Sequence, residues 1–416
     1  METCLNKVLT KKRISFAPPR IDQKIIDAVS ETLKSGWITT GAKTKLFEKK
    51  IADYIKSPKV LCINSATAGL ELALKWFGVK EGDEVILPAY TYSATANVVI
   101  HQGAKPVFVD VNIDDFNISV DAIRKAITDK TKVIIPVDFG GYPCDYDQIN
   151  QLVNENEILS YFSSSNDIQQ QLGRILVLSD SAHSIGSIYN NQKLGTVADF
   201  NVFSFHAVKN ITTAEGGAIS FGLPAPFDNE AIYNYFSINS LHGQTIDAQK
   251  KIIENNWKYD VIMPGYKKNM PDVLASIGLV EIERYDETLA KRKNVFEAYS
   301  EGFKDCNWAL LPIYKNEQKE SSYHIYALRV KGIDEKRRDE LIKNILNQGV
   351  SVNVHFQPVP MFSYYKQLGY KVSDYPNAYA NYAAEISLPV YFDLTDYQIE
   401  YIIEIVKNSV KEVLGK

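Results

Sequence analysis

The chain has 416 residues, of which 45% are hydrophobic and 23% are charged, a composition typical of a soluble globular protein with room for two domains. A net charge of −4, with no segment that concentrates lysine and arginine, argues against nucleic-acid binding. The N-terminus lacks the apolar core of a signal peptide, and no apolar run approaches the roughly 18 residues that span a bilayer. Four widely spaced cysteines without a CxxC pair indicate a reducing compartment. We therefore expect a cytoplasmic protein that binds neither nucleic acid nor membrane.

Short apolar runs predict strands at residues 60–64, 84–90, 105–111, 132–139, 174–180, 201–206 and 217–222. The runs at 132–139 and 174–180 are continuously apolar, as expected of central strands that are covered on both faces. Helices are expected between the strands, at residues 93–103 and 117–127 and where Leu70, Ala73, Leu74 and Phe77 recur with the spacing of one helix face. This alternation predicts an α/β fold with a mostly parallel central sheet and helices on both faces.

The segments that flank this alternation have different patterns. Residues 20–36 predict a helix, and the polar residues 150–173 indicate a helix with a surface excursion. Residues 225–270 have such weak periodicity that we expect them to be irregular. The C-terminal part predicts helices and strands in alternation, at residues 287–304, 323–330, 334–348, 351–356 and 396–413. We therefore divide the chain into a large domain, residues 1–285, and a small α+β domain, residues 286–416.

Several common functional motifs are absent from the sequence. There is no GxGxxG motif after the first strand and no GxxxxGK(S/T) motif, so neither dinucleotide nor P-loop nucleotide binding is indicated. The chain has no GxSxG motif for an acyl-transfer serine. Its six histidines include no HxxxH pair, so we expect no metal site.

Other short motifs follow predicted strands, where open α/β sheets bind their ligands. Ser65, Ala66 and Thr67 begin a predicted helix, where backbone N–H groups can bind a phosphate, although a simple helix cap is the alternative. Tyr92 follows the strand at 84–90, where its ring would cover a flat ligand or pack half-buried. Asp180 ends a buried strand, and burying a carboxylate is costly unless it caps a helix or meets a cation.

The stretch SFHAVKN contains Ser204 and Lys209, and SDSAH contains His183. Taken alone, Lys209 is expected to be a solvated surface charge and His183 a structural histidine. A phosphate-binding turn, an aromatic ring, a buried carboxylate and a lysine at one sheet edge are, however, what pyridoxal phosphate requires. The lysine bonds covalently to this cofactor, and the carboxylate keeps the pyridine nitrogen protonated so that the ring withdraws electrons.

These motifs resemble those of the pyridoxal-phosphate-dependent sugar aminotransferases of fold type I, the DegT/DnrJ/EryC1/StrS family. The resemblance extends from about residue 15 to about residue 410 and is carried by SGWITTG (35–41), NSATAGLELAL (64–74), GDEVILPAYTYSATANVV (82–99), GAKPVFVDV (103–111), SDSAHSIGS (179–187), FSFHAVKNITTAEGGAI (203–219), GYKKNMPDVLASIG (265–278) and SLPVY (387–391). It implies a pyridoxal 5'-phosphate cofactor, with pyridoxamine phosphate as its second form, and a homodimer with active sites at the subunit interface.

The resemblance also implies roles for individual residues. Lys209 is implied to bond to the cofactor and to move the proton during transfer, and Asp180 to pair with the pyridinium nitrogen. Tyr92 matches the residue that stacks on the ring, and His183 lies where the family has Gln or His near the 3-oxygen.

Phosphate contacts are implied for a second set of residues. Ser65, Ala66 and Thr67 match the phosphate-binding turn, in which Ala66 replaces a frequent glycine, and Ser204 matches a phosphate-binding serine. Lys267 replaces a common Asn in a segment that reaches the cofactor phosphate of the partner subunit.

The implied reaction transfers an amino group from glutamate to a nucleotide-activated keto sugar. We favour amination at C4 of a UDP-linked 2-acetamido-4-keto-2,4,6-trideoxyhexose for a bacterial surface polysaccharide. Trp37, Thr39 and Thr40 match a loop near the sugar. Further candidates for substrate binding, each more often structural when taken alone, are Asn239, His242, His324 and His355.

Three alternatives remain at this point. Some relatives carry a histidine in place of the lysine and dehydrate sugars, and Lys209 argues against that reaction. A keto-cyclitol or 3-keto-sugar aminotransferase differs only in its substrate. Regulatory proteins fuse this fold to a DNA-binding module, and we expect none here because few residues precede the matching region.

Overall fold

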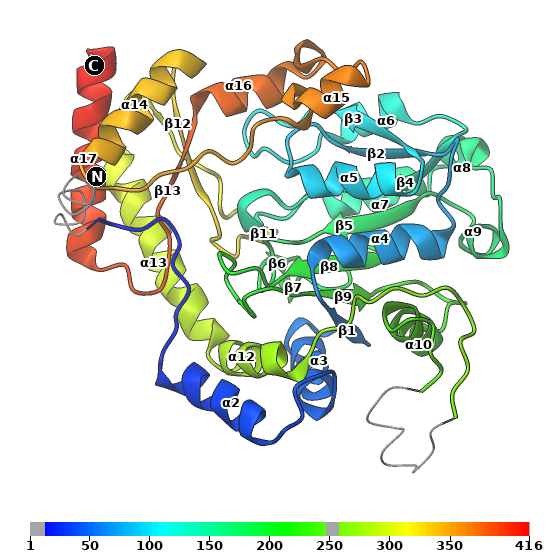
Figure 1. Ribbon diagram of the computed structural model, residues 1–416. Coiled ribbons are helices and arrows are strands. Elements are labelled where there is room, and N and C mark those ends of the chain that lie inside the picture. Colours follow the sequence, from blue (N-terminus) through cyan, green and yellow to red (C-terminus); the bar gives the residue numbers. More distant parts are fainter. Residues whose placement is uncertain (1–12, 247–257, 416) are drawn as a thin grey trace.

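The computed structural model describes residues 13–246 and 258–415. Its centre is a seven-stranded sheet with the strand order β1-β9-β8-β5-β4-β2-β3, in which β9 is antiparallel to both neighbours and the other described pairings are parallel (Figure 1). The strands are β1 (Val60–Ile63), β2 (Glu84–Pro88), β3 (Lys105–Val109), β4 (Thr131–Ile134), β5 (Leu176–Asp180), β8 (Phe200–Ser204) and β9 (Gly217–Phe221). The α/β fold with a mostly parallel sheet, predicted above, is confirmed.

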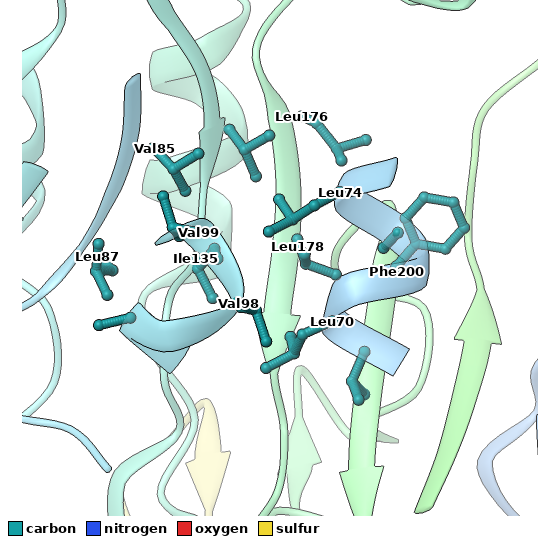
Figure 2. Close-up of a cluster of buried hydrophobic side chains, with 14 of the residues drawn as sticks. Leu70, Leu74, Val85, Leu87, Val98, Val99, Ile135, Leu176, Leu178 and Phe200 are labelled. Carbon is teal, nitrogen blue, oxygen red and sulfur yellow. The ribbon is translucent and has the colours of Figure 1, made fainter. Parts of the chain in front are cut away.

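Helices cover both faces of this sheet. On one face, α4 (Ala66–Phe77) and α5 (Ser93–His101) place Leu70, Leu74 and Val98 against the strands, as Figure 2 shows. On the other face lie α3 (Ala42–Ile55), α7 (Tyr146–Val153) and α12 (Asp272–Glu283). Because side chains alternate along a strand, Leu178 of β5 packs toward α4 while Val177 packs toward the opposite helices. The result is a three-layer core that holds the strand ends rigidly.

The C-terminal part forms a second, smaller layer structure. An antiparallel sheet in the order β10-β12-β13 packs against three long helices, and its elements are β10 (Ala309–Leu310), β12 (Tyr326–Val330), β13 (Glu385–Leu388), α13 (Tyr285–Phe303), α14 (Glu335–Asn347) and α17 (Asp396–Leu414). Figure 1 shows these elements beside the large sheet, with α13 leading from one part to the other. The small sheet β11-β6-β7, at Lys319–Glu320, Ile188–Tyr189 and Gln192–Lys193, joins the two parts because β11 follows α13 and pairs with β6.

The remaining helices lie at the periphery and have the bounds α2 (Gln23–Lys34), α6 (Val120–Ala126), α8 (Asn156–Tyr161), α9 (Asp167–Leu172), α10 (Asn229–Ser240), α15 (Ser363–Gln367) and α16 (Pro376–Ala384). In the described ranges 13–246 and 258–415, no helix combines the length and the apolar character needed to cross a bilayer.

Two predictions of local structure are wrong. Residues 351–356 form no strand beyond an isolated bridge from Asn353 to Ser387, because Glu385 Oε2 accepts the N–H of His355 that the next rung of a ladder with β13 would use. Residues 225–270 are not irregular throughout, since α10 lies within them, and residues 247–257 fall outside the described part. The periodicity of α10 is weak because its buried side includes the polar Asn239 and Ser240 beside Ile232 and Phe236.

Candidate active site

A cavity of about 490 Å³ opens at the carboxyl ends of β1, β2, β5 and β8. Ten of the residues singled out in the sequence line it, namely Ser65, Ala66, Thr67, Tyr92, Asp180, His183, Ser204, Lys209, His324 and His355. They come from both halves of the chain, so the fold brings together residues that are up to 290 positions apart (355 − 65). In open α/β sheets this edge is the usual ligand-binding position.

Lys209 lies in the loop that connects β8 to β9. Its backbone N–H donates to His206 O, which closes a turn and directs the side chain into the cavity that it lines. Burial lowers the pKa of Lys209 to about 8, although the charge of Asp180 raises it. An amine with this pKa carries a proton below pH about 8 and releases it above, which suits both proton transfer and nucleophilic attack.

Asp180 is the last residue of β5 and is 7% exposed. Its carboxylate accepts hydrogen bonds from Thr95 Oγ1, at 2.8 Å, and from Ala182 N, at 3.3 Å. Burial raises the pKa of Asp180, while these donors and the charge of Lys209 lower it. Both donors are neutral, so a cation placed in the cavity would compensate the buried charge.

The turn at the N-terminus of α4 forms another part of the cavity wall. Ser65 caps the helix, since its Oγ accepts from Ala68 N at 3.1 Å, and it also lines the cavity; the cap and the ligand position coexist. Gly217 begins β9 directly against this turn, where a Cβ would lie 2.5 Å from Ala66 N and 2.6 Å from the Ser65 carbonyl carbon. Glycine therefore allows the strand to support a turn whose first N–H groups have no partner within the helix.

His183 and His324 face each other with ring centroids 4.5 Å apart. His183 Nδ1 accepts from Gly140 N, at 3.3 Å, so its proton lies on Nε2. His324 Nδ1 contacts Asn210 Oδ1 at 2.9 Å; because Asn210 Nδ2 donates to Ser322 O, the proton of His324 lies on Nδ1. Burial, with the nearby Lys209 charge, lowers the pKa of both rings, which stay neutral.

Tyr92 and Ser204 complete the predicted set. Tyr92 is 64% exposed, and its ring lies 5.9 Å from that of Phe356 at the cavity wall. Ser204 ends β8 and accepts a long hydrogen bond of 3.4 Å from His206 N, which leaves its hydroxyl proton free to donate.

Other predicted residues do not line this cavity. Trp37 Nε1 donates to Thr40 O, and Thr40 Oγ1 donates to Met270 O at 2.6 Å, so this loop is tied to the segment before α12. Thr39 O accepts from Asp272 N. The side chain of Lys267 is exposed.

His242 and Asn239 lie near the end of α10, also away from the cavity lining. His242 is exposed, and its backbone N–H donates to Tyr266 O at 2.7 Å. Asn239 is 1% exposed, and its side-chain amide has no hydrogen-bond partner among residues 13–246 and 258–415. Neither His242 nor Asn239 therefore lines the cavity of this chain.

Several residues near the cavity were not singled out from the sequence, among them Phe16, Phe356, Thr95 and Asn210. Phe16 and Phe356 line the cavity, Thr95 bonds to Asp180, and Asn210 orients His324. Phe16 precedes the first predicted helix and carries no motif, whereas Thr95 and Asn210 lie three positions after Tyr92 and one after Lys209. Thr95 and Asn210 lie inside two of the motifs quoted above, and this position was the signal that could have identified them.

The cavity fits pyridoxal phosphate by its own chemistry. It combines a lysine of lowered pKa, a buried carboxylate that a pyridinium would neutralise, and a helix N-terminus for the phosphate. On an α/β sheet of this topology, these groups define a pyridoxal-phosphate-dependent enzyme.

Comparison with known proteins gives the family. The model of the DegT/DnrJ/EryC1/StrS aminotransferase family matches residues 19–407, and the chain belongs to this family. It is therefore a pyridoxal-phosphate-dependent aminotransferase.

Individual relatives are similar to this chain over nearly its whole length. Spr1654 of Streptococcus pneumoniae, a proposed sugar aminotransferase solved in its PLP and PMP forms, is 44% identical with a TM-score of 0.92, over 97% of this chain and at least 99% of its own. MJ1066 of Methanocaldococcus jannaschii is 39% identical over 96% of this chain and 99% of its own length. The spore coat polysaccharide biosynthesis protein SpsC of Bacillus subtilis is 35% identical over 97% of this chain and 99% of its own length.

Proposed function

We propose that this enzyme transfers the amino group of glutamate to a nucleotide-activated keto sugar that serves surface polysaccharide biosynthesis. The observation that carries the proposal is the convergence of Lys209 and Asp180 in a cavity whose wall also includes the neutral, hydrogen-bonding imidazoles of His183 and His324. Such a wall suits a substrate rich in hydroxyl groups. The names of Spr1654 and SpsC, which refer to a sugar aminotransferase and to polysaccharide biosynthesis, support the same substrate class.

The particular substrate that we propose is a UDP-linked 2-acetamido-4-keto-2,4,6-trideoxyhexose, aminated at C4. A cavity of about 490 Å³ accommodates a cofactor together with a hexose, and its open side leaves the nucleotide outside. The apolar Val208 and Phe356 also line the cavity, which suits the C6 methyl group of a 6-deoxy sugar.

Each residue then has a role. Bound pyridoxal phosphate supplies the electron-withdrawing ring on which transamination depends. Lys209 Nζ moves the proton in each half-reaction, because its lowered pKa allows it to accept and release a proton near neutral pH. Asp180 holds the proton on the ring nitrogen, and the N-terminus of α4 with Ser204 binds the phosphate. Tyr92, which lines the cavity, would cover one face of the ring.

We further propose a homodimer in which the Trp37–Thr40 loop and Lys267 reach the cavity of the partner subunit. Large apolar side chains are exposed around these segments, namely Ile26, Leu33, Ile38, Val261 and Ile262. A subunit interface would cover these exposed apolar side chains. Sedimentation of the holoenzyme at a monomer mass would contradict this part of the proposal.

The substrate is tested with a panel of nucleotide keto sugars. The holoenzyme is incubated with glutamate and, in turn, with 4-keto and 3-keto sugars carried on UDP or dTDP, and the position of the new amine is read by NMR. We expect the highest kcat/KM for the UDP-linked 4-keto sugar, with the amine at C4. Amination at C3, or transfer to no sugar in the panel, would contradict the proposal.

A further inference from the structure

Glu385, at the start of β13, is a buried carboxylate outside the groups that the cofactor would contact. It is 0% exposed, and its Oε1 accepts a short hydrogen bond from Ser387 Oγ. Its Oε2 accepts from the backbone N–H of His355 at 3.0 Å. Both donors are neutral, so no direct ion pair compensates the cost of burying this carboxylate.

Ser387 connects this carboxylate to the imidazole of His355, which lines the cavity. Ser387 Oγ lies 2.8 Å from His355 Nδ1. Since Ser387 donates its only proton to Glu385, the nitrogen must be the donor in this contact. An ionised Glu385 therefore places the proton of His355 on Nδ1.

The opposite edge of the ring agrees with this assignment. Asn353 Oδ1 accepts from Val354 N at 2.8 Å, which turns Asn353 Nδ2 toward His355 Nε2 at 3.4 Å. Nε2 is thus a hydrogen-bond acceptor, and the bonds from Asn353 through His355 and Ser387 to Glu385 all run in one direction.

The imidazole is also held in place by its surroundings. Phe16 stacks on the ring with centroids 5.5 Å apart and an interplanar angle of 23°, and Tyr90 Oη donates to His355 O at 2.5 Å. The Nδ1 edge is held at 2.8 Å by Ser387 of β13, whereas Nε2 has only the long contact with Asn353, so Nε2 is the nitrogen that a ligand in the cavity would engage.

The charged groups around Glu385 only partly stabilise its ionised form. Arg338, on α14, directs its guanidinium to the carbonyl oxygens of Tyr382 and Glu385, and Arg329, on β12, directs its own to Asn381 and to carbonyl oxygens at 113 and 114. Burial raises the pKa of Glu385 to about 8, while the hydrogen bonds and the two arginine charges lower it.

Two other titratable groups face this chain of hydrogen bonds. Burial raises the pKa of the Tyr90 hydroxyl, which stays neutral, and burial together with the charge of Lys209 lowers the pKa of His355 to about 3. The carboxyl of Glu385 is consequently the group of this network that titrates near neutral pH.

We propose that Glu385 and Ser387 are positioning residues that decide whether His355 offers the substrate a hydrogen-bond acceptor or a donor. With Glu385 ionised, Nε2 of His355 accepts from a hydroxyl group of the sugar, which takes the place of the long contact from Asn353; this contact rests on the proposed function. When Glu385 takes up a proton from solvent, it donates to Ser387, which donates to Nδ1, and Nε2 carries the proton instead. The productive state is the ionised one, which the Asn353 contact matches.

The first test reads the tautomer of His355 without any substrate. NMR of isotope-labelled histidine nitrogens in the holoenzyme, with His355→Asn to assign the signal, should show the proton on Nε2 below pH about 8 and on Nδ1 above it. In Glu385→Gln, the backbone N–H of His355 keeps the amide oxygen in place, so the amide nitrogen donates to Ser387 and the proton stays on Nε2 at every pH. If the tautomer of His355 changes neither with pH nor in Glu385→Gln, the proposal is overturned.

The second test separates the two half-reactions. Above pH about 8, Glu385→Gln and Ser387→Ala should lower kcat/KM for the sugar about tenfold, the size of one lost hydrogen bond, and leave kcat/KM for the amino donor within about twofold. Ser387→Thr keeps the hydroxyl and should restore the sugar value. Glu48→Gln, which removes another buried carboxylate, should change neither. Equal losses in both half-reactions would show a structural role and overturn the proposal.

The two proposals fail in different ways. A wild-type holoenzyme that aminates no sugar contradicts the proposed function, and the tautomer measurement still decides the present proposal.

Discussion

The two sides of the cavity differ in origin and in chemistry. The floor lies at the strand ends of the large sheet and carries the ionisable pair Lys209 and Asp180. The facing wall comes from segments next to β12 and β13 and carries His324 and His355, whose burial keeps them neutral. We therefore expect the floor to perform the steps common to both half-reactions and the wall to contact the sugar. Substitutions on the floor should stop all turnover, and substitutions on the wall should affect one substrate.

The largest effect is expected at Lys209. Lys209→Ala should lower the rate of both half-reactions at least about a thousandfold, because the group that moves the proton and bonds to the cofactor is lost. The visible absorption band of the holoenzyme should disappear with it. Stopped-flow spectroscopy of each half-reaction measures both effects, and Lys80→Ala, at an exposed lysine, serves as the control. Turnover that survives Lys209→Ala would contradict the division of roles.

A smaller loss is expected at Asp180. Asp180→Asn keeps the contact with Thr95 but removes the charge that holds the ring proton, so kcat should fall about a hundredfold in both half-reactions. Steady-state kinetics with each substrate tests this expectation. A loss confined to the sugar half-reaction would contradict the expectation that Asp180 acts in both half-reactions.

The support beneath the floor is tested at Gly217. In Gly217→Ala the new Cβ would press on the backbone of Ser65 and Ala66, which has to shift. We expect the Kd of pyridoxal phosphate to rise about thirtyfold, which corresponds to a typical overpacking cost of about 2 kcal/mol. Fluorescence titration of the apoenzyme measures the affinity, and circular dichroism checks the fold. An unchanged Kd would mean that the turn does not bind the phosphate.

The smallest effect is expected at the wall. Asn210→Ala removes the acceptor that holds the proton of His324 on Nδ1, so kcat/KM for the sugar should fall about fivefold, with the amino-donor half-reaction unchanged. The same stopped-flow assay compares the two. A larger loss with the amino donor than with the sugar would contradict the assignment of this wall to the sugar.

The floor was predictable from the sequence because its residues stand within or directly after strands with a clear apolar pattern. Asp180 ends one such run and Lys209 follows another by a few residues, so the parallel topology alone brings them to one edge. Phe16, from the N-terminal segment, had no such signal, and an isolated histidine such as His355 carries no pattern of its own.

The errors in the fold share a physical cause. Residues 351–356 alternate like a strand, yet the side chain of Glu385 accepts the N–H of His355 that a ladder with β13 would use. The same Glu385 contact holds the backbone of His355, which lines the cavity, so the prediction from the alternating pattern failed at a segment of the candidate site. The helix α10 was missed because polar residues occupy part of its buried side.

The most direct test of the central claim is to find the lysine that bonds to the cofactor. The holoenzyme is reduced with borohydride, digested and mapped by mass spectrometry. The account predicts a pyridoxyl group on Lys209 and on no other lysine. A pyridoxyl group on another lysine, or none on Lys209 in a catalytically active preparation, would contradict it.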